Sequence, residues 1–174
     1  MKEAKYLIVV DMQNDFIDGA LGTPEAQAIV PAAVARIRRA VDEGWNIIAT
    51  MDTHEDNYPD TAEGRKLPVK HCIRGTHGWM IADAIDAELH GAKIVKKPTF
   101  GCVKLPGMIE PADDLTIEFI GLCTDICVVS NALLVKAHFP EARVSVNSAC
   151  CAGVTPEKHS AALETMASCQ IDIL

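Results

Sequence analysis

The chain has 174 residues, a mass of 18.8 kDa and 49% hydrophobic residues, which is typical of one soluble globular domain. These values exclude a disordered chain and a collagen-like one. The net charge of −8 disfavours binding to nucleic acid or to an anionic membrane, because an acidic surface repels phosphate groups.

The apolar stretches near the start of the chain are short. Residues 6–10 form the longest of them, and a membrane-spanning helix needs roughly 20 residues. Asp11 ends this stretch, so we expect neither a membrane anchor nor a signal peptide. The seven cysteines are an odd number without a secretory signal, and they predict reduced thiols in a cytoplasmic protein.

Short apolar strands alternate with helices along the chain. The expected strands cover residues 6–10, 46–51, 93–96, 116–120, 143–146 and, as a short last strand, 170–174. The expected helices cover residues 31–43, 79–89, 125–138 and 155–168. This alternation predicts a three-layer α/β/α domain over residues 1–174, with a mostly parallel sheet of five to six strands.

Reactive side chains follow four of the expected strands. Asp11 follows the first, Asp52 and His54 follow the second, Lys97 follows the third, and Cys127 lies after the fourth at the start of a helix. Open parallel sheets bind ligands outside the carboxyl ends of their strands. We therefore expect these side chains to meet in one site.

Asp11, Lys97 and Cys127 have the chemistry of covalent acyl transfer. A cysteine attacks as a thiolate, which a helix N-terminus and a nearby lysine ammonium favour. An aspartate can take the thiol proton and return it to a leaving group. Taken singly, Cys127 is most simply a buried apolar side chain, Asp11 a loop cap and Lys97 a surface charge. Their coincidence at adjacent strand ends favours a site.

Three segments carry a resemblance to a known family. Residues 9–16 (VVDMQNDF) resemble the opening motif of the isochorismatase-like cysteine hydrolases, and residues 121–128 (GLCTDICV) resemble their nucleophile motif. Residues 94–100 (IVKKPTF) are similar to the segment that carries the catalytic lysine. The resemblance implies a catalytic triad of Asp11, Lys97 and Cys127, with Lys96 as the alternative lysine.

The same resemblance implies a cis peptide bond between Leu122 and Cys123. In the family this bond precedes the nucleophile loop. It would direct the N–H group of Cys123, together with that of Cys127, at the substrate oxygen, and such donors stabilise the oxyanion of acyl transfer.

A second group of side chains has the composition of a metal site. Asp52 and His54 are two residues apart, so they point to the same side if the strand continues through them. His71 follows a loop that contains Glu63. Carboxylates combined with imidazoles suit zinc, iron or manganese.

Residues 53–76 are similar to the metal-binding region of nicotinamidases, one branch of this family. The resemblance assigns the ligands to Asp52, His54 and His71, with Glu63 as the fourth and Asp60 as a weaker substitute. Other isochorismatase-like hydrolases lack the metal, so its presence would favour a nicotinamidase-like activity with zinc as the leading cofactor.

The resemblance implies hydrolysis of nicotinamide through a Cys127 thioester. Phe16 and Phe100 would line an aromatic slot for the ring. Many nicotinamidases have a tryptophan where this chain has Leu67, and Trp79 could replace it. The family also suggests a homo-oligomer acting on a small-molecule amide.

Three alternatives remain at this stage. The first is hydrolysis of another small amide or ureido compound. The second is a non-catalytic relative of the fold that senses a ligand or a metal. The third is a redox protein that uses Cys123 and Cys127, although their spacing differs from the C-x₂-C of redox motifs.

Overall fold

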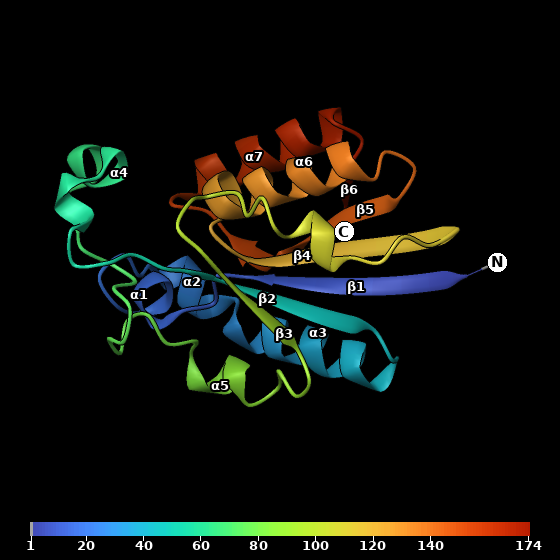
Figure 1. The fold of residues 1–174 in the computed structure, drawn as a ribbon, viewed down its shortest axis with the longest axis horizontal. Helices are drawn as coiled ribbons and strands as arrows, with labels where there is room; N and C mark the ends of the chain where they lie inside the picture. Colours follow the sequence, from blue (N-terminus) through green and yellow to red (C-terminus); the bar gives the residue numbers. More distant parts are fainter. Residues whose placement is uncertain (1) are drawn as a thin grey trace.

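The chain forms one six-stranded sheet between two layers of helices (Figure 1). This computed structural model describes residues 2–174. The strands are β1 (Glu3–Val10), β2 (Asn46–Asp52), β3 (Lys93–Lys97), β4 (Asp114–Leu122), β5 (Arg143–Ala152) and β6 (Asp172–Ile173). Their order is β3-β2-β1-β4-β5-β6, and each neighbouring pair is parallel. The predicted fold class is therefore confirmed.

Seven α-helices and three further helical turns, of the 3-10 or π type, connect the strands in the described part of the chain. The α-helices are α1 (Asn14–Ile17), α2 (Pro24–Ala28), α3 (Val30–Asp42), α4 (Ala62–Lys66), α5 (Asp83–Asp86), α6 (Val129–His138) and α7 (Pro156–Ser168). The turns are η1 (Tyr58–Asp60), η2 (Pro106–Met108) and η3 (Thr124–Val128). Helices α3 and α5 cover one face of the sheet, and α6 and α7 cover the other (Figure 1).

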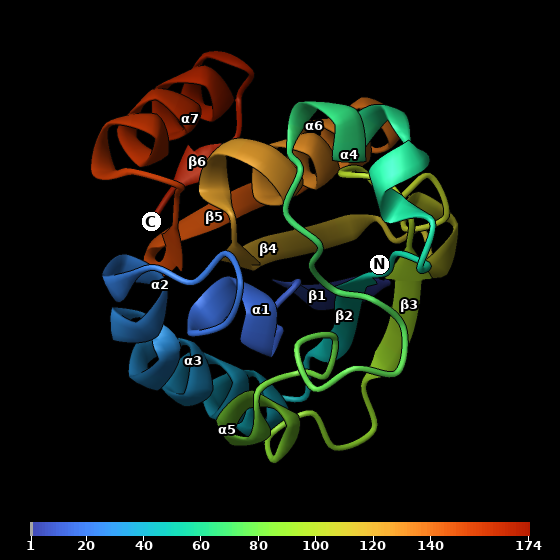
Figure 2. The same cartoon turned by 90° about the vertical axis from the view of Figure 1, so that its left-hand side faces the viewer.

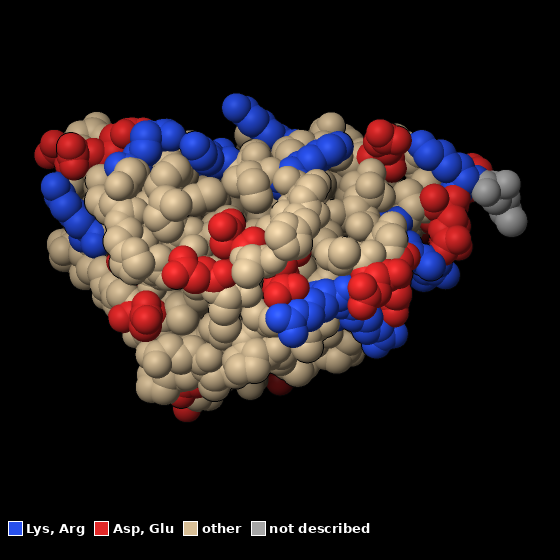
Figure 3. Space-filling view, turned by 90° about the horizontal axis from the view of Figure 1, so that it is seen from below, with Lys and Arg blue, Asp and Glu red and all other residues tan. Residues whose placement is uncertain are grey.

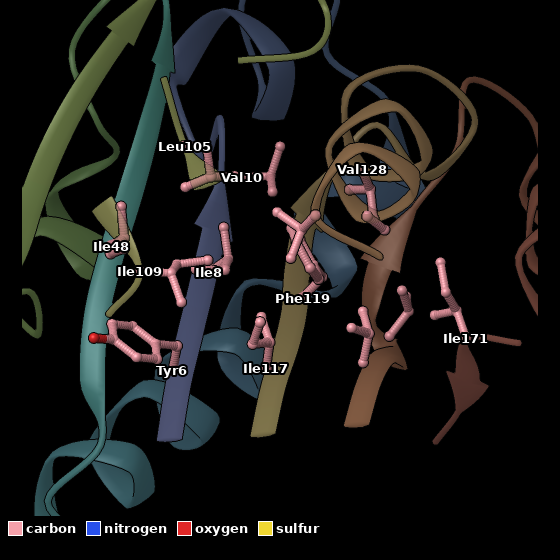
Figure 4. Close-up of a cluster of buried hydrophobic side chains, with 14 of the residues drawn as sticks. Tyr6, Ile8, Val10, Ile48, Leu105, Ile109, Ile117, Phe119, Val128 and Ile171 are labelled. Atoms are coloured by element: carbon pink, nitrogen blue, oxygen red, sulfur yellow. The ribbon is translucent and has the colours of Figure 1, made fainter. Parts of the chain in front are cut away.

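Strict alternation along the central strands divides the core between the two faces. Tyr6, Ile8 and Val10 of β1 point toward the layer of α6 and α7, next to Phe119 of β4 (Figure 4). Leu7 and Val9 point to the opposite cluster under α3. Because both faces of the sheet are covered, residues 6–10 of the central strand β1 form a continuous apolar run in the sequence.

The strand order reverses between β1 and β4, which places a crevice at their carboxyl ends. Helices α1, α2 and α4 gather at this end of the sheet (Figures 1 and 2). Gly121 lies beside Val10 there with φ of +119°, and a side chain at this position would collide with the Val10 backbone. The close passage needs glycine. Asp11 and Cys123 thus leave neighbouring strands at the crevice.

The prediction of a helix over the whole of residues 79–89 is wrong, because within this segment only Asp83–Asp86 is helical. The start of this segment pairs with the loop after β1 instead. Ile81 forms an isolated bridge with Gln13, and the Ala82 N–H donates to the Met12 carbonyl at 3.0 Å. Tertiary pairing therefore outweighs the local helical pattern there.

Several predicted boundaries also differ, and two of the differences are the largest. Strand β5 continues to Ala152, six residues past its predicted end at position 146. The helix predicted from residue 125 begins as a π-helical turn at Thr124, and the regular α-helix starts only at Val129. The nucleophile motif therefore lies in an irregular turn, a feature that is frequent at functional sites.

A buried ion pair joins the helical layer to the sheet. Glu118 of β4 receives two hydrogen bonds from Arg36 of α3, at 2.8 and 2.7 Å. The two side chains are 6% and 10% exposed. Removing one partner of such a pair leaves the other charge buried without compensation.

We expect Glu118→Gln to lower the free energy of unfolding by about 3 kcal/mol, the cost typical of a broken buried pair. Urea denaturation of both proteins measures this difference. Glu88→Gln is the matched control, because Glu88 pairs with Arg38, an exposed arginine that lies on α3 as Arg36 does. This substitution should change the free energy of unfolding far less. Equal effects of the two changes would contradict the expectation.

The charged side chains of the described residues lie mostly at the surface. On the face that α3 and α5 cover, most of the middle is uncharged with a few acidic side chains, and the basic side chains lie mainly toward the edges (Figure 3). Within residues 2–174, no helix has the length and apolar character needed to cross a bilayer.

Candidate active site

Asp11 is held rigidly at the end of β1. It is fully buried, and its φ of +48° lies in the left-handed region that non-glycine residues rarely adopt. Such conformations persist where surrounding contacts enforce them, often at functional sites. The Asp11 N–H donates to the Thr50 carbonyl at 3.2 Å, and the Thr50 hydroxyl donates to Asp11 Oδ1 at 2.6 Å.

Lys97, the last residue of β3, points its ammonium into the same crevice although it is only 1% exposed. Its Nζ lies 2.6 Å from Asp11 Oδ2 and 3.3 Å from Cys127 Sγ. It also donates to the Thr99 carbonyl at 3.1 Å and to Asp52 Oδ1 at 3.4 Å. Four partners therefore fix this one cation.

Cys127 lies in the π-helical turn and is 4% exposed. Burial and the Asp11 carboxylate raise the pKa of its thiol well above the ordinary value, against the opposing effect of Lys97. These surroundings therefore disfavour a free thiolate, although the sequence pattern suggested a lowered pKa. An attack by sulfur consequently requires a base beside it.

Asp11 has the properties of that base. Burial raises the pKa of its carboxyl, although the Lys97 charge opposes the shift. Burial would lower the pKa of Lys97, but the Asp11 carboxylate keeps it above its usual range, so the ammonium stays charged. Asp11 Oδ2 accepts no aligned hydrogen bond, which leaves a lone pair to receive the thiol proton.

A cluster of two carboxylates and two imidazoles lies beside these three residues. The ligand atoms of Asp52, His54, Glu63 and His71 all lie within 4.8 Å of one another. Asp52 Oδ2 is 2.9 Å from His54 Nε2 and 3.5 Å from His71 Nε2. Glu63 Oε1 is 3.6 Å from each of the two Nε2 atoms.

The donor atoms of this cluster fit a divalent transition metal. The Nδ1 of His71 lies 2.8 Å from the Val69 carbonyl, so it carries the proton and leaves the Nε2 lone pair directed at the cluster. Glu63 Oε1 is buried without a hydrogen-bond partner, which is costly unless a cation or water binds it. Two nitrogen and two oxygen donors suit zinc, iron or manganese.

Asp52 connects the two groups. Its Oδ1 accepts from Lys97 Nζ at 3.4 Å, and its Oδ2 faces the histidines. Burial alone would raise the pKa of Asp52, but hydrogen bonds from His54 and His71 and the charge of Lys97 lower it. The carboxylate therefore stays ionised between the cluster and the lysine.

A cavity of about 260 Å³ opens directly onto Cys127. Most of its wall is apolar. The lining side chains are Phe16, Leu21, Thr23, Ala26, Leu67, His71, Phe100, Ile126, Val154 and Lys158, with Cys123, Cys127 and Gly153. Phe16 is 8% exposed and Phe100 44% exposed. The volume suits a small molecule of about one aromatic ring, below the usual range of drug-sized pockets.

The structure separates the alternatives for three of the candidate residues. Lys96 is exposed, and its Nζ lies 4.8 Å from the ring centroid of Trp79, so Lys97 is the lysine in the site. Asp60 is not part of the ligand cluster, whereas Glu63 is. Trp79 does not line the cavity, and its indole N–H donates to the Thr53 hydroxyl at 2.9 Å.

The peptide bond between Leu122 and Cys123 is cis, as the resemblance implied. Cys123 also lines the cavity. Leu122 is fully buried and does not line it.

Sequence reasoning missed three buried polar residues that build this site. Thr50 binds Asp11 as described, and the side chain of Gln13 exchanges hydrogen bonds with the Asp52 backbone at 2.7 and 2.8 Å. Asn131 contacts the Cys127 carbonyl at 2.8 Å. Asn131 had a visible signal, since it is an amide within the apolar stretch 126–135. Thr50 and Gln13 had none.

The chain is similar to several known proteins. The isochorismatase domain matches residues 5–174 of the chain. A nicotinamidase/pyrazinamidase of Mycobacterium tuberculosis is 25% identical over 97% of each chain. A pyrazinamidase of Pyrococcus horikoshii, solved in complex with zinc, is 29% identical over 98% of each chain with a TM-score of 0.81. A nicotinamidase/pyrazinamidase structure from Bacillus subtilis, 24% identical over 98% of each chain, shares the fold with a TM-score of 0.84.

Proposed function

Because this chain belongs to the isochorismatase family, we propose that it is a single-domain hydrolase of linear amide C–N bonds with nicotinamide as its substrate. One observation carries the proposal. Lys97 contacts both Cys127 and Asp11, Cys127 lines a small apolar cavity, and a cluster of four side chains able to bind a metal lies beside Lys97. The relatives named for nicotinamide and pyrazinamide hydrolysis support the choice of substrate.

The first half of the reaction forms a thioester. Asp11 Oδ2 takes the proton of the Cys127 thiol while sulfur attacks the carboxamide carbon. Lys97, 3.3 Å from Sγ, stabilises the negative charge that develops on sulfur. The backbone N–H groups of Cys123 and Cys127 hold the oxyanion, and one such donor can contribute about 10²–10³ in rate.

The second half restores the enzyme. Asp11 returns its proton to the amide nitrogen, the C–N bond breaks and ammonia leaves. Water then adds to the thioester carbon, with Asp11 as the base that receives its proton. The C–S bond breaks, the thiol regains its proton, and the products are nicotinic acid and the free enzyme.

Four side chains would hold the metal: Asp52, His54, Glu63 and His71. A bound divalent ion would act as a Lewis acid for the ring nitrogen and lower the pKa of bound water to about 7. His71 lines the cavity, so the ligand cluster borders the space where the ring lies. Phe16 and Phe100 form apolar walls on which an aromatic ring can pack.

Glu63 and Asp60 give a matched test of the ligand set. We expect Glu63→Gln to weaken zinc binding by roughly tenfold or more, since loss of even a residue that only orients a metal ligand typically costs about 10- to 100-fold. Asp60→Asn should leave zinc binding unchanged, because Asp60 lies outside the cluster. Competition with a chromogenic chelator measures both affinities. Equal zinc affinity in the two variants would contradict the assignment of Glu63.

Ammonia release from nicotinamide tests the function. The metal-loaded protein should hydrolyse nicotinamide, and a strong chelator should reduce the rate. Benzamide, which lacks the ring nitrogen, should be the poorer substrate. Turnover of other small amides or ureido compounds but not of nicotinamide would overturn the choice of substrate. If the protein binds small amides but hydrolyses none of them, the result would instead support a ligand-sensing role.

A further inference from the structure

Asn131 of α6 is a fully buried amide on an apolar helix, and no step above uses it. Its side chain is 0% exposed. A buried amide is costly unless its polar atoms find partners, and here they do. Oδ1 accepts from the Cys102 N–H at 2.8 Å. Nδ2 donates to the carbonyls of Phe100 at 3.0 Å and Cys127 at 2.8 Å.

These partners lie in two segments that carry the reacting groups. One partner is the carbonyl of the nucleophile itself, four residues earlier in the chain. The others belong to the turn after β3, residues 98–102. In that turn the Thr99 carbonyl accepts from Lys97 Nζ at 3.1 Å, and the Phe100 ring lines the cavity. Asn131 thus joins the nucleophile to the segment that holds its cation and one wall of the substrate cavity.

We propose that Asn131 is a positioning residue that sets the distance between the Lys97 ammonium and the Cys127 sulfur and holds Phe100 against the substrate. Three hydrogen bonds from one rigid side chain to three backbone groups fix the two segments relative to each other. Cys127 lies in a π-helical turn just before the regular α-helix that carries Asn131. The amide of Asn131 supplies a donor at that point.

Misplacing catalytic groups is expensive even when the chemistry remains intact. A displacement of about 1 Å can cost about 10²-fold in rate. Without Asn131, the turn at 98–102 keeps its bond to Lys97 but loses its bonds to α6. Lys97 Nζ and Cys127 Sγ, now 3.3 Å apart, would then separate more often.

Two substitutions distinguish positioning from stability. Asn131→Ala removes all three hydrogen bonds and leaves a gap in the core. Asn131→Thr fills more of that gap, and its hydroxyl can donate to the carbonyl four residues earlier, which is that of Cys127. The threonine side chain is shorter than asparagine and does not reach the turn at 98–102. It therefore restores one bond of the three.

Three measurements are made on each variant: the melting temperature, kcat and KM for nicotinamide, and the rate of Cys127 alkylation by iodoacetamide near neutral pH. We expect kcat to fall roughly 10- to 100-fold in both variants, with a smaller change in KM. Alkylation of Cys127 should slow in both, because Lys97 then stabilises the thiolate less. Asn131→Thr should recover melting temperature relative to Asn131→Ala without recovering kcat.

Asn147→Ala is the matched control. The Asn147 side chain donates a hydrogen bond of 3.2 Å to Glu118, and neither residue is part of the site. It should lower the melting temperature and leave kcat and alkylation unchanged. The proposal is overturned if Asn131→Thr regains wild-type kcat, or if the Asn131 variants lose only stability.

The inference rests on the proposed function for its kcat readout alone, because alkylation needs no substrate. If nicotinamide is not a substrate but Cys127 alkylation still slows in both variants, the choice of substrate fails and the positioning role stands. If iodoacetamide alkylates Cys127 of the wild type no faster than it alkylates an inert buried thiol, then Lys97 does not activate Cys127 and the positioning role fails.

Discussion

Replacing Cys127 by alanine is expected to lower nicotinamide turnover by at least about 10⁴-fold, since loss of a covalent nucleophile removes an entire pathway. Cys127 lines the cavity, and its Sγ is the sulfur in contact with Lys97. Ammonia release under saturating nicotinamide measures the effect. The fold should persist, because the substitution removes one buried sulfur from a large core.

Cys169→Ala is the control for thiol loss, since Cys169 is an exposed cysteine at the end of α7. This variant should keep wild-type turnover. The zinc affinity of Cys127→Ala should also match that of the wild type, because Cys127 is outside the ligand cluster. Turnover within about tenfold of the wild type in Cys127→Ala would be incompatible with a thioester pathway.

The second large effect is expected for Asp11→Asn, which should reduce kcat/KM by roughly 10²- to 10⁴-fold, the range typical of a lost general base. Asparagine has the same shape and can still accept the hydrogen bond from Thr50. It cannot take the thiol proton, and the thiol has a raised pKa. The loss therefore isolates proton transfer from packing.

The pH dependence gives the same residue a second test. Asp11 must be ionised to act as the base, and burial raises its pKa above the ordinary value. Activity of the wild type should therefore fall as the pH decreases through this raised pKa, above the roughly 3.9 of an ordinary aspartate. The residual activity of Asp11→Asn should lack this acid limb. An unchanged acid limb in the variant would assign the titration to another group.

Asp18→Asn is the control for removal of an acidic side chain, because Asp18 is an exposed residue after α1. It should retain both the rate and the pH profile of the wild type. A loss in this variant equal to that of Asp11→Asn would point to a general effect of charge rather than to proton transfer.

The sequence predicted the fold and the place of the reacting groups for one physical reason. Residues 6–10 of β1 form a continuous apolar run because both faces of this central strand are covered, so its end is visible where Asp11 begins the polar residues. The edge strand β3 is short and ends in two lysines, of which Lys97 is the last. Two adjacent lysines left the register open, and burial separates them because only Lys97 is enclosed.

The walls of the cavity could not be predicted in the same way. The segment from residue 67 to residue 82 has no periodic pattern, and its path depends on pairing with the loop after β1. Trp79 was therefore placed on a helix that does not form, and it points to Thr53 instead of the cavity. Leu67 and Phe100 meet across the cavity from distant parts of the chain.

Trapping the acyl-enzyme tests the central claim most directly. The metal-loaded protein is mixed with excess nicotinamide, quenched in acid within one turnover, and analysed by intact-mass and peptide mass spectrometry. The account predicts a mass increase of one nicotinoyl group on the peptide that contains Cys127, absent from Cys127→Ala. Steady ammonia release with no adduct on Cys127 at any quench time, in a protein where Cys127→Ala still turns over, would contradict it.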